Sequence, residues 1–114
     1  MDISPAVFSL LLALHGGERH GYALMADVEK LTDGAVVLGP ATLYRSLQRM
    51  RVDGLVEEIA TEDEDVRADR RAERRRSYRI TARGREATAA EAARLFRLVA
   101  AAAELGVLME RKPS

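Results

Sequence analysis

Residues 38–55, LGPATLYRSLQRMRVDGL, decide the fold and carry the first candidate for a functional surface. Gly39-Pro40 predicts a helix start, because proline has no N–H to lose at the first helical position and its φ already suits a helix. Asp53-Gly54 predicts the end of that helix, and Leu55–Ala60 reads as a strand. Between them, apolar residues recur at i, i+4 and i+7 and predict a core-facing stripe: Leu43, Leu47 and Met50.

The other side chains of this helix point away from the stripe at 100° per residue. They include Ala41, Tyr44, Arg45, Gln48 and Arg49. Such a front suits the major groove of DNA, where Arg and Gln pair with base edges while Tyr and Thr contact phosphates. A solvated surface helix has the same pattern, so the rest of the chain must separate the two interpretations.

Length and charge set limits on both interpretations. A chain of 114 residues is one domain, and much of its 47% hydrophobic content is alanine, so its core is thin. The net charge is zero, which counts against a DNA-binding protein unless the charge is segregated. Basic residues do gather on the central helix and in the segment after it: Arg45, Arg49, Arg51, Arg67, Arg70, Arg71, Arg74, Arg75, Arg76 and Arg79. Acidic residues gather separately: Glu57, Glu58, Glu62, Asp63, Glu64 and Asp65.

The sequence lacks the residues that several kinds of catalytic and metal sites require. There is no cysteine, which is compatible with a reducing cytoplasm and removes thiolate zinc sites and cysteine nucleophiles. Glycines separate His15 from His20, and no nucleotide-binding or hydrolase motif is present. We therefore expect no enzyme, no metal and no cofactor. Val7–Leu14 is too short to span a bilayer and follows no basic region, so we expect neither a membrane segment nor a signal peptide.

The first and last helices carry more apolar surface than one small domain needs. Ser4-Pro5 predicts a helix to about Leu14, with one apolar face of Ile3, Val7, Leu10, Leu11 and Leu14. Phe8 and Leu12 form a second face. Thr81 caps a final helix from Ala82 to about Leu105, about 35 Å long. Its seam contains Leu95, Leu98, Val99, Ala102 and Leu105, and Phe96 widens the apolar arc beside the seam. This surplus predicts a homodimer joined by the final helix and helped by the first.

The middle of the chain predicts a winged helix. Glu18–Gly21 reads as a turn, and Tyr22–Thr32 as a helix with a stripe of Leu24, Val28 and Leu31. A link at Ala35–Leu38 joins it to the central helix in a helix-turn-helix-like unit. Leu55–Ala60 and Ser77–Ile80 pair as a hairpin around a charged loop. We expect Thr61–Asp69 to be a solvated linker, and Arg70–Arg76, with Arg74, Arg75 and Arg76, to contact phosphates.

Four short motifs in this order and spacing resemble the PadR family of bacterial transcriptional regulators. They are His-Gly-Tyr at 20–22, Pro-x-Thr-Leu-Tyr at 40–44, Asp-Gly-Leu at 53–55 and Tyr-Arg-Ile-Thr-x-x-Gly at 78–84. The resemblance covers about Ile3 to Leu108. Ala41 stands where a glycine is common in the family, and the loop at Thr61–Arg76 is longer than the usual wing.

The resemblance implies a homodimeric repressor that binds inverted-repeat operators in double-stranded DNA and is often relieved by a small-molecule effector. It places Tyr22, Pro40, Ala41, Thr42, Tyr44 and Arg45 at DNA-facing positions, with a wing at Leu55–Ile80. The fold it implies is mainly α (α+β): a winged helix-turn-helix domain at 1–81 and a dimerisation helix with its tail at 82–114, as in the shorter branch of the family. The alternative that the residues leave open is a winged-helix protein-interaction module that does not bind DNA.

Overall fold

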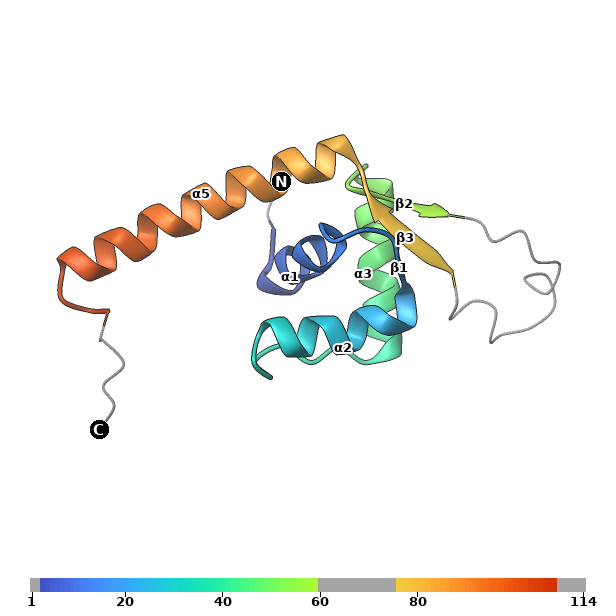
Figure 1. Ribbon diagram of the computed structural model, residues 1–114, viewed down its shortest axis with the longest axis horizontal. Coiled ribbons are helices and arrows are strands. Elements are labelled where there is room, and N and C mark those ends of the chain that lie inside the picture. The colour runs from blue at the N-terminus through green and yellow to red at the C-terminus, as the bar shows by residue number, and fades with distance from the viewer. Residues whose placement is uncertain (1–2, 60–75, 109–114) are drawn as a thin grey trace, which may run out of the picture.

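The computed structural model describes residues 3–59 and 76–108. These residues form four helices and three strands, in the α+β arrangement expected (Figure 1). In chain order they are α1 (Pro5–Leu14), β1 (Arg19–His20), α2 (Gly21–Leu31), α3 (Pro40–Val52), β2 (Val56–Ile59), β3 (Ser77–Ile80) and α5 (Ala82–Glu104).

The core lies where α1, α2 and α3 meet the inner face of the small sheet. Ser4 caps α1, because its Oγ accepts from the Val7 N–H at 3.1 Å, and Pro5 begins the helix. The apolar stripes of the three helices supply the fully buried side chains: Leu10, Leu11, Leu14, Leu24, Val28, Leu43, Leu47 and Met50. The sheet and the link before α3 close the core with Leu38, Leu55, Val56, Tyr78 and Ile80.

The sheet contains a strand that the sequence did not predict. Its order is β1-β3-β2, with both pairs antiparallel. The predicted hairpin of β2 and β3 is confirmed, and Glu57 lies opposite Arg79 in it. The interpretation of Glu18–Gly21 as a turn is wrong, because Arg19 and His20 pair with Tyr78 and Ser77. Two exposed polar residues carry no apolar alternation, so only their pairing with β3 makes them a strand.

Helix α5 is joined tightly to the sheet at its first turn. Thr81 caps the helix, since its Oγ1 accepts from the Gly84 N–H at 2.9 Å. The same hydroxyl donates to the carbonyl oxygen of Gly54 at 2.6 Å, and the Thr81 N–H donates to that of Leu55 at 3.0 Å. A Cβ on Gly84 would lie 2.1 Å from the Leu55 carbonyl oxygen. The absence of a side chain at Gly84 is therefore what allows α5 to sit this close to β2.

Beyond its first turns, α5 leaves the body of the molecule. Its inner face touches α1 and β3, with Gly84 and Thr88 buried, and its outer half projects past the domain (Figure 1). The radius of gyration is 16.5 Å, against about 13 Å for a compact domain of this length. The projecting helix contributes to this difference.

Two details of the expected apolar faces differ from the structure. Leu31, assigned to the buried stripe of α2, is 53% exposed at the last position of the helix. The first apolar face of α1 buries Leu10, Leu11 and Leu14 but leaves Ile3 and Val7 only partly buried. Helix periodicity assigns a direction to each residue, but these three residues lie at or near helix ends, where the opposing element covers them less.

Candidate nucleic-acid interface

The outer face of α3 is open to solvent while its inner face is fixed in the core. Leu43 and Leu47 are 0% exposed, whereas the outward side chains are exposed along the helix: Ala41, Thr42, Arg45, Gln48, Arg49 and Val52. The cap residue Gly39 provides no side chain, and Pro40 occupies the first turn. The outer face of this N-terminal end is therefore narrow, because its outward side chains before Arg45 are the small ones of Ala41 and Thr42.

Tyr44 is oriented differently from what the helix pattern predicted. Its ring is half-buried and packs against the core, although the sequence placed it with the outward residues. A Cβ on Gly21 would lie 2.8 Å from Tyr44 Cε1 and 2.9 Å from its Oη. The ring therefore fills the space that the missing side chain of Gly21 leaves at the start of α2. Tyr44 thus fixes α3 against α2.

The three arginines of α3 have different partners. Arg49 Nε lies 3.6 Å from Asp53 Oδ2, one turn along the helix. Arg51 Nη2 donates to Gln48 Oε1 at 3.0 Å. Arg45 is exposed and forms no hydrogen bond or ion pair in the described part of the chain. The centre of the outward face is thus an arginine whose donors are all available.

The strands beside α3 carry paired charges. Arg76 Nη1 lies 3.0 Å from Glu58 Oε2, and Arg79 Nε donates to Glu57 Oε2 at 2.9 Å. The sequence predicted that Arg76 faces phosphates, and here its charge is neutralised by a neighbouring strand. Arg74 and Arg75 lie outside the described residues. The described base of the hairpin therefore presents balanced charge rather than a basic surface.

Tyr78 and Arg19 link β1, β3 and α2 beneath this hairpin. Burial raises the pKa of Tyr78 to about 12, with a further contribution from the negative charge of Glu58. Arg19 Nε and Nη2 donate to the two carboxylate oxygens of Asp27 at 2.7 and 2.8 Å, and these hydrogen bonds raise the pKa of Arg19. Tyr22, in the first turn of α2, is 59% exposed.

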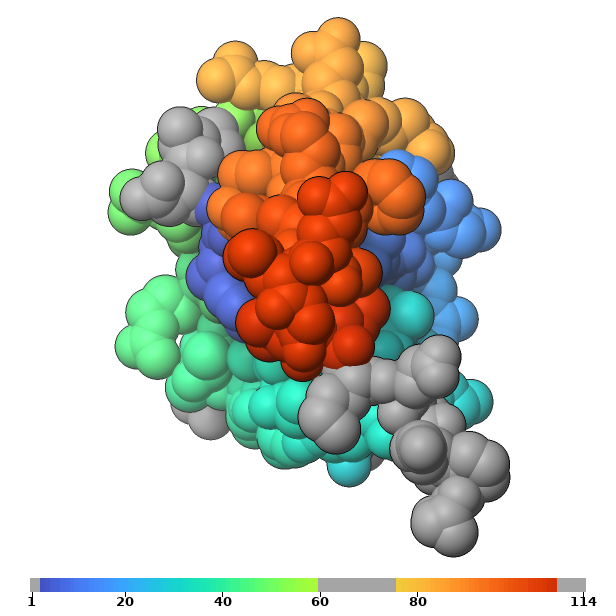
Figure 2. Space-filling model, turned by 90° about the vertical axis from the view of Figure 1, so that its left-hand side faces the viewer, coloured from blue at the N-terminus to red at the C-terminus, as the bar shows by residue number. Residues whose placement is uncertain are grey.

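A second surface is apolar and lies on the outer half of α5. Its large side chains are open to solvent: Phe96 is 73% exposed, Leu98 55%, Val99 50% and Leu105 77%, and Val107 and Leu108 continue the surface. Leu95 and Ala102 are partly buried. Figure 2 shows this end of α5 standing in front of the domain.

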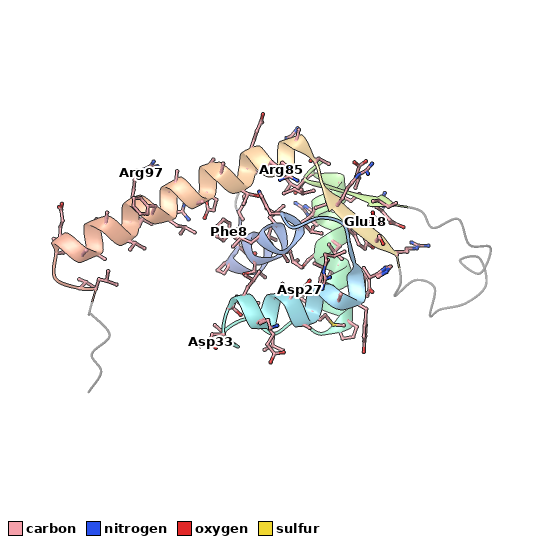
Figure 3. All side chains as sticks on the ribbon, in the orientation of Figure 1. Phe8, Glu18, Asp27, Asp33, Arg85 and Arg97 are labelled. Carbon is pink, nitrogen blue, oxygen red and sulfur yellow. The ribbon has the colours of Figure 1, made fainter. Side chains whose placement is uncertain are left out.

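The first helix offers less apolar surface than expected. Leu12 is 40% exposed, but Phe8 is half-buried. Figure 3 shows Phe8 on the side of the domain from which α5 projects. Leu12 and Leu31 line an open groove of about 460 Å³ between α1 and α2.

Within the described residues, no helix has the length and apolar character needed to cross a bilayer. The same residues contain no group of three or more side chains suited to hold a metal ion.

The sequence model described as the transcriptional regulator PadR-like family matches residues 10–90. The chain belongs to this family. Its members are transcriptional regulators rather than enzymes. A comparison with curated proteins found no match to this sequence.

Solved structures of PadR-like and other regulators share this architecture. A transcriptional regulator from Clostridium thermocellum has 23% identity and a TM-score of 0.65, over 89% of this chain and 88% of that one. A PadR family regulator from Clostridium difficile has 16% identity and a TM-score of 0.63, over 86% and 96%. A PadR-like regulator from Bacillus cereus has 22% identity and a TM-score of 0.62, over 90% and 91%. At these identities the likeness establishes the winged-helix fold.

Sequence reasoning missed three residues that position the elements around the candidate nucleic-acid interface. Gly21 and Gly84 permit close approaches, to the Tyr44 ring and to the Leu55 carbonyl, and Asp27 pairs with Arg19 across two elements. The glycines stood inside the motifs at 20–22 and 78–84, so their positions carried a signal. The Asp27 pairing depends on β1, which the sequence did not predict.

Proposed function

We propose that this PadR-like regulator is a homodimeric repressor that places α3 of each protomer in the major groove of an inverted-repeat operator. One observation carries the proposal. The outward face of α3 presents Arg45, Gln48 and Arg49 to solvent, on a helix whose opposite face is fully buried. An exposed helix with side chains able to pair with base edges, held rigidly by its core, is what direct readout of DNA requires.

The wing adds contacts to the DNA backbone in this proposal. The hairpin of β2 and β3 lies beside α3, which in this proposal brings it next to the DNA backbone that flanks the groove. Arg74, Arg75 and Arg76 would neutralise phosphates there. Tyr22 and Thr42, both exposed near helix N-termini, would contact the backbone at the groove edge.

The dimer follows from the exposed apolar surface of α5. Three side chains in its outer half and that of its cap residue are at least half exposed, namely Phe96, Leu98, Val99 and Leu105, and such a surface marks an interaction site. Pairing of this half with its mate and with Leu12 of the other protomer would cover it by two-fold symmetry. Residues 82–114 would then act as the dimerisation segment of a DNA-binding unit at 1–81.

A two-fold dimer would also match the geometry of an inverted repeat. Half-sites read in successive major grooves lie about 34 Å apart, and α5, with 23 residues, is about as long. Repression in the bacterial cytoplasm, and its relief by a small molecule, rest on family resemblance.

Selection from random duplexes tests DNA binding. Wild-type protein should enrich an inverted repeat, and a variant with alanine at Arg45, Gln48 and Arg49 should not. Loss of even one bidentate base contact costs about 1–3 kcal/mol. All three side chains are exposed, so circular dichroism should show an unchanged fold. Enrichment by neither protein, with a folded wild type, would favour the interaction module that does not bind DNA.

Sedimentation at micromolar concentration tests the dimer. Leu98→Asp should yield a folded monomer, because Leu98 is 55% exposed within the protomer and burial of a leucine in an interface contributes about 1.5–3 kcal/mol. Operator affinity should fall although no DNA-facing residue changes. The neighbouring Arg97→Asp is the matched control and should stay dimeric. A wild-type monomer that binds its operator fully would refute the dimer.

A further inference from the structure

We infer that Arg45 is the residue of α3 that reads a base, and that the base is a guanine in each half-site. The inference rests on the proposed function, which places α3 in the major groove, and it adds the identity of the reader and of its base. The geometry of α3 separates Arg45 from the two other side chains that could pair with bases, Gln48 and Arg49.

Direction is the first argument. At 100° per residue, the buried residues Leu43, Leu47 and Met50 define the inward direction of α3. Arg45 then lies within about 15° of the direction opposite to them. Gln48 and Arg49 lie about 50° to either side. A helix seated in the groove turns its outermost side chain toward the base edges, whereas side chains on its flanks face the phosphates along the groove walls.

Position along the helix is the second argument. Arg45 is the sixth residue of α3, which begins at Pro40. Recognition helices contact base edges mainly with their N-terminal residues. The residues ahead of Arg45 help such contact, because Gly39, Ala41 and Thr42 are small and Tyr44 turns back into the domain. Nothing bulky on the outer face therefore holds this end of α3 away from the groove.

Availability of donors is the third argument. Arg49 lies 3.6 Å from a carboxylate oxygen of Asp53, and the Gln48 carbonyl already accepts from Arg51 at 3.0 Å. To read a base, either side chain would have to share or give up its partner. Arg45 has none to give up among the described residues. In the proposed complex, all the guanidinium N–H groups of Arg45 are available to pair with a base.

The chemistry of the guanidinium selects the base. Guanine presents two acceptors, N7 and O6, on its major-groove edge, and arginine pairs with both at once. Adenine offers only one acceptor beside a donor, and cytosine offers a donor. A lone, outward arginine with no acceptor beside it therefore discriminates in favour of guanine.

A comparison of base analogues and variants tests this assignment. The operator is first selected with wild-type protein, and each guanine of the half-site is then replaced in turn by 7-deazaguanine, which lacks the N7 acceptor. At one position the replacement should weaken wild-type binding, and a full change of base there should weaken it about 5- to 150-fold. Arg45→Ala should lose affinity for the original site and become insensitive to that position. Gln48→Ala and Arg49→Ala should keep the sensitivity.

The outcomes separate this assignment from the function on which it rests. If wild-type protein enriches no sequence, the proposed function fails. If wild-type protein enriches a site but Arg45→Ala still distinguishes guanine from its analogue at every position, Arg45 is not the reader. Equal losses by Arg45→Ala on operator and random duplex, with a flatter salt dependence, would also overturn the assignment, because they mark a phosphate contact. Arg97→Ala removes the same charge from α5, away from α3 (Figure 3), and controls for net charge.

Discussion

The contact between Gly84 and β2 can be tested by a substitution for which two physical effects predict opposite signs. Alanine in place of a helical glycine ordinarily stabilises a helix by about 1 kcal/mol. At Gly84, however, the new Cβ would lie 2.1 Å from the Leu55 carbonyl oxygen and 2.7 Å from Ile80 Cγ1. Carbon–oxygen contacts in proteins rarely fall below about 3.3 Å. The first turn of α5 would have to move by about 1.2 Å, the shortfall from that contact distance.

The cost of that movement can be estimated from the groups that it disturbs. Overpacking of this kind costs about 1–3 kcal/mol. The Thr81 N–H bond to Leu55 and the Thr81 hydroxyl bond to Gly54 would lengthen, and each contributes about 1 kcal/mol. Even after the gain in helix propensity, Gly84→Ala should lower the free energy of unfolding by about 2–4 kcal/mol. For a domain of this size the melting temperature should fall by about 10–20 °C.

Thermal unfolding followed by circular dichroism measures this effect, at one protein concentration because the proposed dimer makes melting depend on it. Gly16→Ala is the matched control. A Cβ at Gly16 meets no atom within 4 Å, so the melting temperature should stay the same or rise slightly. If Gly84→Ala proves as stable as wild type, the close approach of α5 to β2 does not exist in solution and the reasoning is refuted.

Three other predictions test the elements around α3. Tyr44→Ala should lower the free energy of unfolding by about 2–3 kcal/mol in chemical denaturation, because it empties the space beside Gly21, whereas Tyr44→Phe should retain most of the stability; equal stability of both would contradict this packing. The triple variant Arg74→Gln, Arg75→Gln, Arg76→Gln should weaken binding to operator and random DNA alike, and each lost phosphate contact should flatten the slope of log K against log salt by about 0.9; an unchanged slope would show that these arginines make no phosphate contact. Glu58→Gln should strengthen binding to any duplex, because it releases Arg76. The unfolded state releases the Tyr78 proton near pH 10 and the folded state near pH 12, so stability should fall by up to about 1.4 kcal/mol per pH unit between these values, and Tyr78→Phe should abolish that part of the slope.

Much of this fold could be predicted from local patterns. The stripe of Leu43, Leu47 and Met50, the proline at the start of α3 and the strand at Ser77–Ile80 all appear where the sequence placed them. Each of these depends on neighbours within about one or two turns. Periodicity and capping chemistry report such short-range relations directly.

The orientation of Tyr44 could not be predicted in the same way. On the helix wheel Tyr44 lies about 90° from the centre of the buried stripe, at the border between inside and outside. At that angle, helix periodicity does not predict whether a side chain points into the core or toward solvent. What turns the ring inward is the empty space at Gly21, more than twenty positions earlier in the chain. The sequence therefore predicted the outward direction of Arg45, Gln48 and Arg49 correctly and that of Tyr44 wrongly, because a contact distant in sequence decides the direction of the ring.

The expected basic wing shows a related limit. A run of arginines predicted positive charge beside α3, but its described end at Arg76 is paired with Glu58, and Arg79 with Glu57. Both carboxylates were visible in the sequence. Their effect depends on the register between β2 and β3, which places Glu57 opposite Arg79. Charge counted along the chain therefore overestimates the positive charge at the described base of the hairpin.

Leu55 joins the parts that the proposed function requires to work together. Its N–H donates to the Met50 carbonyl at the end of α3, and its carbonyl accepts from Thr81 at the start of α5. Gly84 packs on that same carbonyl, so the end of α3, the start of β2 and the first turn of α5 meet at one residue. In the proposed dimer, the distance between the two α3 helices would therefore depend on how the two α5 helices pair.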